Sequence, residues 1–215
     1  MFLYLSAAKY NLRFSLFPQL AAAIGLLVLT PVMFGIKALD AVAAAYPLEL
    51  CLPFIGVILL TPVYSPEQEP GILDTVCARK MPHLLICGIR IIMAMVLTVI
   101  LICGFVVMMS ALECEVFVVH ALSSCVNAFF LGGLGILASS VSGHAVSGYI
   151  LPVLYYVADL TGGFGHFTMF SMMRSGTTDG RYIIFITGIC CIAASVWCRH
   201  LRMICFHERL FKKIS

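Results

Sequence analysis

The sequence contains little charge for its length. Asp, Glu, Lys and Arg make up only 11% of its 215 residues, whereas about a quarter of a typical soluble domain is charged. Hydrophobic residues make up 62% of the chain, and the mean hydropathy is +1.07. At about 20 residues per membrane span, six spans use about 120 residues and leave loops too short to fold as a second domain. We therefore expect one all-α transmembrane domain over residues 1–215, without an internal ATPase or receptor domain.

The sequence also lacks the common motifs of enzymes and of nucleotide binding. It contains no G-x-x-x-x-G-K-[ST], no H-E-x-x-H and no G-x-S-x-G. The formal net charge of +3 is too small to indicate a nucleic-acid partner. No C-x-x-C occurs among the ten cysteines, and a C-terminal group matches no zinc signature, namely Cys198, His200, Cys205 and His207. We expect this chain to bind no metal, cofactor or nucleic acid and to carry no catalytic residues of its own.

Uninterrupted apolar stretches predict six membrane spans. They cover residues 16–36, 48–63, 84–109, 116–141, 145–160 and 182–197. Residues 37–47 and 110–115 are then short loops, and 199–215 form a basic tail. Small residues on the fourth and fifth spans predict close helix packing, either within the chain or across a dimer; they are Gly132, Gly133, Gly135, Ser139, Gly143, Ser147 and Gly148.

The distribution of Lys and Arg predicts the orientation of these spans. Ten of these residues lie on the side of the two termini and three, Lys37, Arg174 and Arg181, lie on the other. Positive residues accumulate on the cytoplasmic side of membrane proteins. We therefore expect a multi-pass protein of the plasma membrane with both termini in the cytoplasm.

The cytoplasmic connection 64–83 has the pattern of a short amphipathic helix. Prolines and acidic residues stand at its start, and Arg79 and Lys80 stand near its end. Apolar residues recur at three- and four-residue spacing along one face, namely Ile72, Leu73, Val76, Cys77 and Met81. Such a face fits a helix resting on lipid headgroups, or a helix that docks on a cytoplasmic protein.

The same connection resembles the signature of ABC-2 type permeases. The run 69–74 reads Glu-Pro-Gly-Ile-Leu-Asp, and it is followed by Arg79, by Pro82 and by a span with Arg90 near its start. In that family an acidic residue, a Gly-Thr pair, a Leu-acidic pair, a proline turn and a basic residue lie between the second and third of six spans. Ile72 stands where the family usually has Thr.

This resemblance implies a type V exporter-like bundle that works with other subunits. An amphipathic helix over residues 1–15 would precede the first span. The loop would dock on a separate ABC ATPase subunit, present in two copies and carrying ATP and Mg²⁺, and a second permease copy or a paralogue would complete the complex. The expected coupling residues are Glu69, Gly71, Leu73, Asp74, Val76 and Arg79.

The segment 161–181 is too apolar for a loop that faces only water. It carries Phe164, Phe167 and Phe170 among methionines and glycines. We expect a re-entrant helical segment whose phenylalanines form an outer gate, as the resemblance also implies; an ordinary interfacial loop is the alternative.

Few polar side chains lie inside the spans. Those most able to line a pathway are Gln19, His120, Asn127 and Tyr155, which could equally serve as hydrogen-bond partners between helices. The expected function is the permease subunit of an ABC exporter that moves a hydrophobic peptide, a drug-like molecule or a lipid. The alternatives are a non-transporting six-span immunity or sensor protein, and an intramembrane enzyme using Ser147 and His144.

Overall fold

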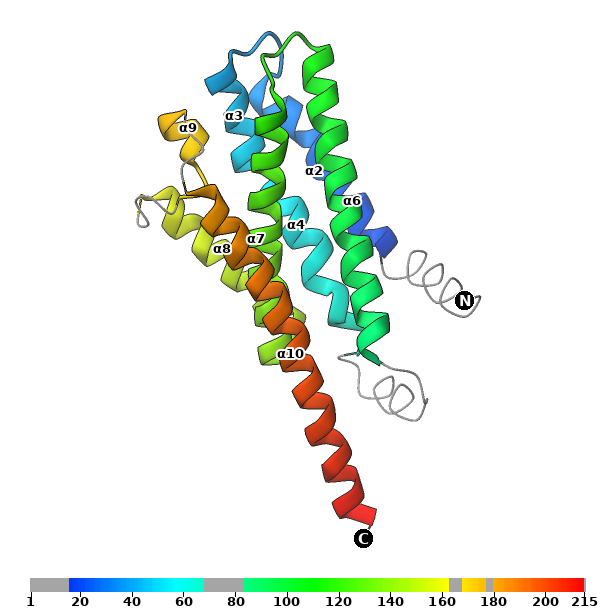
Figure 1. Ribbon diagram of the computed structural model, residues 1–215. Coiled ribbons are helices and arrows are strands. Elements are labelled where there is room, and N and C mark those ends of the chain that lie inside the picture. The colour runs from blue at the N-terminus through cyan, green and yellow to red at the C-terminus, as the bar shows by residue number, and fades with distance from the viewer. Residues whose placement is uncertain (1–15, 68–82, 163–167, 177–179, 215) are drawn as a thin grey trace.

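The computed structural model of the chain describes residues 16–67, 83–162, 168–176 and 180–214 (Figure 1). Every regular element in these residues is a helix. The elements are α2 (Phe17–Phe34), α3 (Ala41–Leu50), α4 (Pro53–Leu60), the 3₁₀ helix η2 (Thr61–Glu67), α6 (His83–Ala111), α7 (Val118–Ser142), α8 (Ala145–Leu160), α9 (Ser171–Ser175) and α10 (Arg181–Ile214). The expected all-α class is therefore confirmed for the described part of the chain.

Five helical segments are long and apolar enough to cross a membrane. They are Phe17–Phe34, Ala41–Ser65, Cys87–Ala111, Val118–Ser142 and Arg181–Leu201. The remaining predicted span corresponds to α8, which is apolar but has only 16 residues. At 1.5 Å per residue such a helix measures about 24 Å, less than the hydrocarbon thickness of about 30 Å. The chain is thus a multi-pass membrane protein by the length and composition of its helices.

The predicted start of the second span is wrong. The second span begins at Ala41 instead of residue 48, so most of the expected loop 37–47 is helical. Alanine is the strongest helix former, and Asp40 precedes the helix with extended backbone, whereas Pro47 lies inside the helix and does not end it. The last span, Arg181–Leu201, agrees with the predicted sixth span, and α10 continues beyond it to Ile214, because no glycine or proline follows Gly188 to stop it.

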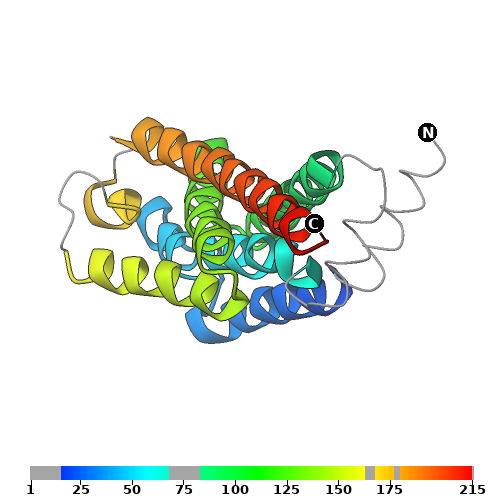
Figure 2. The same ribbon diagram turned by 90° about the horizontal axis from the view of Figure 1, so that it is seen from below.

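Helix α7 lies at the centre of the bundle and packs against α4, α6, α8 and α10, as Figure 2 shows in projection. Glycines make these contacts close. A Cβ atom added to Gly148 would lie 2.8 Å from the carbonyl oxygen of Gly135, and one added to Gly133 would lie 2.8 Å from that of Gly188. The predicted close packing of small residues is confirmed, and it occurs within the chain.

The two ends of the bundle differ. At one end the connections 35–40 and 112–117 are joined by two backbone hydrogen bonds, Ala38 N to Leu112 O at 3.1 Å and Glu115 N to Leu39 O at 2.9 Å. Helix α9 lies in the same half, so we call this the α9 end (Figure 1). The opposite end holds η2, the turn between α7 and α8, and the last turns of α10. Helices α3, α7 and α10 all run from the α9 end toward the opposite end.

Candidate functional site

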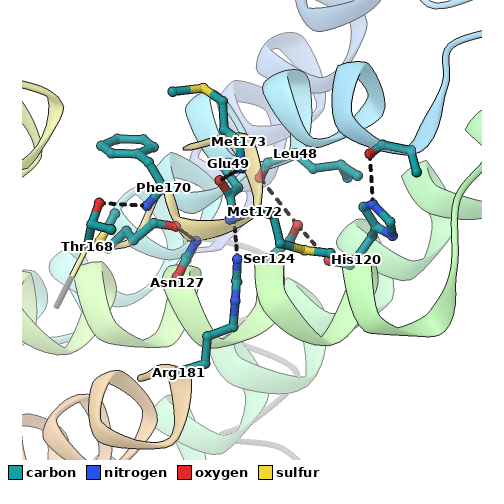
Figure 3. Close-up of polar contacts among 12 residues, drawn as sticks. Leu48, Glu49, His120, Ser124, Asn127, Thr168, Phe170, Met172, Met173 and Arg181 are labelled. Carbon is teal, nitrogen blue, oxygen red and sulfur yellow. Dashed lines mark hydrogen bonds and ion pairs between the residues drawn. The ribbon is translucent and has the colours of Figure 1, made fainter. Parts of the chain in front are cut away.

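A buried ion pair joins α3 to α10 beside α9. Arg181 Nη2 donates to Glu49 Oε1, and the two side chains are only 9% and 1% exposed. Figure 3 shows Arg181 reaching from α10 past α7 to the Glu49 carboxylate. Removing two charges from water is unfavourable unless further hydrogen bonds satisfy them. The Glu49 carboxylate therefore needs hydrogen-bond donors besides Arg181.

The remaining hydrogen bonds of Glu49 come from the backbone of α9. The amide of Met172 donates to Oε1 at 3.2 Å, and the amide of Met173 donates to Oε2 at 3.0 Å. These amides belong to the first turn of α9, where backbone N–H groups have no partner within the helix. One carboxylate thus accepts hydrogen bonds from two different elements, α9 and α10.

Two more buried side chains hold the chain just before α9. The amide of Met169 donates to Asp159 Oδ2 at 2.7 Å, and Asn127 Nδ2 donates to the carbonyl oxygen of Met169 at 2.9 Å. Asp159, on α8, and Asn127, on α7, are both fully buried. We call Glu49, Asn127, Asp159 and Arg181 the α9 clamp. Through it, side chains from α3, α7 and α8 bond directly to the backbone around α9, and α10 holds one of them.

Aromatic packing and a second arginine complete the surroundings of the clamp. Phe170 is fully buried and meets the ring of Tyr156 edge-on at 5.2 Å between centroids. Arg174 donates to the carbonyl oxygens of Asp159 and Leu160 at 3.0 and 2.8 Å, which caps the end of α8. Its guanidinium carbon lies 5.9 Å from the centroid of Phe170.

The local sequence explains why α9 needs these partners. A helix of five residues cannot offset the entropy of ordering its backbone by its own hydrogen bonds. It ends at Gly176, which adopts the left-handed conformation (φ +66°) that glycine tolerates best. The position of α9 therefore depends on the clamp and on the burial of Phe170 and its neighbours.

The clamp lies next to a break in the span Ala41–Ser65. Cys51 and Leu52 separate α3 from α4, and Pro53 has no N–H with which to continue the helical hydrogen bonds. The carbonyl of Leu50, left free by this break, accepts a hydrogen bond from the Tyr156 hydroxyl at 2.9 Å. Glu49 thus stands in the last turn of α3, directly before this break.

The predicted pathway residues lie in different places. Asn127 belongs to the clamp. His120 is buried and joins the starts of α7 and α3, because Nδ1 accepts from the amide of Phe117 at 3.2 Å and Nε2 lies 3.0 Å from the carbonyl oxygen of Ala41. Tyr155 packs edge-on against Phe130 at 4.9 Å between centroids. Gln19 lies in the first turn of α2. Asn127 bonds to the backbone just before α9, at the carbonyl oxygen of Met169.

Of the predicted outer-gate residues, the structure describes Phe170 alone. Phe170 is buried and directly precedes the short helix α9, whereas Phe164 and Phe167 lie outside the described residues. The coupling residues also lie outside them, namely Glu69, Gly71, Leu73, Asp74, Val76 and Arg79. In the C-terminal group, Cys198 and His200 lie on α10, and the side chains of Cys205 and His207 are not described.

Sequence reasoning missed Glu49, Asp159 and Arg181 as members of a site. It used Arg181 only as one of the positive residues that indicate the orientation of the spans. A signal was present, because Glu49 stands between Leu48 and Leu50 in an apolar run. An ionisable residue inside a membrane segment is by default a candidate functional residue.

The α9 clamp consists of non-covalent contacts, which allow reversible release of α9. Its contacts are an ion pair, hydrogen bonds from backbone amides to the carboxylates of Glu49 and Asp159, and the neutral hydrogen bond of Asn127. A hydrogen bond to a charged group contributes about 1.5–3 kcal/mol. These contacts can be broken and re-formed without covalent change.

Comparison with protein-family models, with curated proteins and with solved structures finds no match for this chain.

Proposed function

We propose that this chain is the membrane subunit of an ATP-driven exporter, embedded in the plasma membrane with both termini in the cytoplasm. The observation that carries the proposal is the α9 clamp. A short helix between α8 and α10 is held in the bundle by buried charged and polar side chains, a costly arrangement for a segment that only connects two spans.

In this proposal α8 is the fifth of six spans, and the α9 end faces the outside. The ten-to-three distribution of Lys and Arg supports this orientation. Figure 1 shows α9 at the side of the bundle next to α3, below the level of the connections 35–40 and 112–117. Helix α9 would then close the outer end of a path for the exported molecule, with Phe170 buried beneath it, and would move aside during release.

The energy would come from separate ATPase subunits on the cytoplasmic side. The resemblance of residues 69–82 to the ABC-2 signature supports docking of two such subunits, which carry ATP and Mg²⁺, and a second permease copy or paralogue. A hydrophobic peptide, a drug-like molecule or a lipid fits as cargo, because the spans contain few polar side chains that could solvate a polar one.

Purification of the complex from its native membrane tests this function. The chain, tagged at its natural expression level, should co-purify in stoichiometric amount with a protein that contains G-x-x-x-x-G-K-[ST]. The variant Leu73→Asp/Val76→Asp should insert normally and lose this partner, because it places charge in an apolar contact. The matched control Thr75→Asp/Ala78→Asp alters the opposite face of the predicted helix and should keep the partner.

Two outcomes of this purification would contradict the exporter proposal. If no ATPase accompanies the wild-type chain, or if both double variants retain it equally, the exporter proposal fails. The non-transporting six-span protein would then be the better description.

A further inference from the structure

Glu49 differs from the other clamp residues in the number of elements it joins. Asn127 and Asp159 each bond to the backbone of Met169. Glu49 lies on α3, accepts two amides of α9 and pairs with Arg181 of α10. Its displacement would therefore disturb three elements at once.

We propose that Glu49 is the positioning residue that keeps α9 closed and makes its closure depend on the placement of α3. Arg181 in turn holds the carboxylate in place. The inference deepens the function proposed above and rests on it, because α9 is taken as the outer closure.

The chemistry of the contacts requires a carboxylate at this position. All three groups that face Glu49 are donors: two backbone amides and one guanidinium. An ionised carboxylate is acceptor-only and serves all three with its two oxygens. A glutamine would turn an NH₂ group toward at least one donor, and an aspartate is one methylene shorter, so neither can reproduce the full set.

The position of Glu49 along the chain connects it to the opposite end of the bundle. It lies on the span Ala41–Ser65, whose far end leads directly into residues 68–82, the proposed contact with the ATPase. The break at Cys51 and Leu52 follows within one turn. A tilt of α3 about this break would move the carboxylate away from Arg181 or from α9, and breaks of this kind are where helices bend.

Hydrogen–deuterium exchange of the purified full chain measures the closure of α9 directly. Mass spectrometry on peptides that cover residues 168–176 follows the exchange. The amides of Met172 and Met173 should exchange slowly in the resting protein. In Glu49→Asp, which keeps the charge for Arg181, and in Glu49→Gln they should exchange at least about tenfold faster, since a hydrogen bond to a charged group is lost. Amides of α7 serve as an internal reference, and Glu115→Asp, an exposed acid at the same end, serves as the control variant.

A charge exchange separates positioning of α9 from simple ion pairing. Glu49→Arg/Arg181→Glu restores opposite charges between α3 and α10, but it faces the α9 amides with another donor. We expect slow exchange in α7 and fast exchange at Met172 and Met173 in this variant. If the exchange at α9 becomes slow again, Glu49 serves only as a partner of Arg181 and the inference is overturned.

The aspartate variant protects the test against misfolding, because it leaves no unpaired buried charge. Unchanged exchange at Met172 and Met173 in Glu49→Asp, with α7 intact, also overturns the inference. The proposed function has its own readout: addition of ATP to the complex with the ATPase should accelerate exchange at these amides in the wild type. Slow exchange that ATP does not change, together with fast exchange in the Glu49 variants, leaves the role of Glu49 standing and counts against the exporter.

Discussion

Arg181 and Glu49 lie 132 positions apart in the sequence and form an ion pair between α10 and α3. Each belongs to a helix that starts at the α9 end, and each is almost completely shielded from solvent. The pair therefore ties the beginning of the last span to the second span, at the level where α9 enters the bundle. The backbone of α9 contributes to the stability of the pair by donating two hydrogen bonds to Glu49.

Removing one partner of this pair should destabilise the bundle more than removing both partners. Arg181→Met leaves a buried carboxylate without its counter-charge and should lower the free energy of unfolding by about 3–5 kcal/mol. Glu49→Met/Arg181→Met removes both charges and should lower it by less, although the α9 amides lose their acceptor. Chemical denaturation in detergent micelles measures both. Arg174→Met, which changes an exposed arginine near the clamp, is the control. An equal loss of unfolding free energy in all three variants would contradict a stabilising role for the pair.

Much of the fold followed from composition and spacing. Continuous apolar runs located the helices, and the glycines of α7 and α8 predicted close packing because only small residues let helix backbones approach. The start of α3 could not be placed, because Pro47 was taken as part of a loop. A proline inside a membrane helix is tolerated when neighbouring groups satisfy the freed carbonyl, and that depends on tertiary contacts.

The clamp could not be assembled from the sequence for a related reason. Glu49, Asp159 and Arg181 are far apart in the chain and lie near the ends of apolar runs, where charges usually face water or headgroups. The packing of α9 against α3, the Arg181–Glu49 pair and the hydrogen bond of Asp159 to Met169 bring them together. Asn127 was predicted either to line a pathway or to form a hydrogen bond between helices, but its partner, the carbonyl of Met169, has no signature in the sequence.

The glycine contacts of α7 should tolerate no added methyl group. A Cβ at Gly135 would lie 2.9 Å from the carbonyl oxygen of Gly148 and would also press on Thr61 Oγ1. We expect Gly135→Ala to lower the free energy of unfolding by about 1–3 kcal/mol through overpacking. In Gly104→Ala, where no heavy atom lies within 4 Å of the new Cβ, stability should be unchanged or higher. Equal effects in the two variants, measured by thermal unfolding, would contradict the close approach of α7 and α8.

The orientation predicts which cysteines a membrane-impermeant thiol reagent can reach on intact cells. Cys205 should remain unlabelled until the membrane is permeabilised, because the Lys and Arg distribution places the C-terminus in the cytoplasm. A cysteine introduced at Lys37, an exposed position in the connection 35–40, should be labelled at once. Labelled sites are identified by peptide mass spectrometry. Labelling of Cys205 in sealed cells would reverse the orientation and remove the basis for an ATPase contact at residues 68–82.

The burial of Phe170 leads to the most specific prediction for transport. Its ring is fully enclosed between Tyr156 and the rest of the bundle, so Phe170→Asp would place a charge in an apolar contact and displace α9. We expect this variant to lose export at least about tenfold while it still binds the ATPase, since docking takes place at the other end of the bundle. Thr177→Asp alters a polar position after Gly176 and should leave export nearly unchanged.

A cysteine scan over residues 164–173 decides whether this segment is a closure at all. In the resting protein Phe170→Cys should react with a water-soluble thiol reagent at least about tenfold more slowly than Thr177→Cys, because the probe must wait for local opening of α9. During ATP hydrolysis by the complex the Phe170→Cys reaction should accelerate, because release of cargo requires α9 to move. If every cysteine from 164 to 173 reacts as fast as Thr177→Cys at rest, the segment is an ordinary external loop, and loss of export in Phe170→Asp would need another cause.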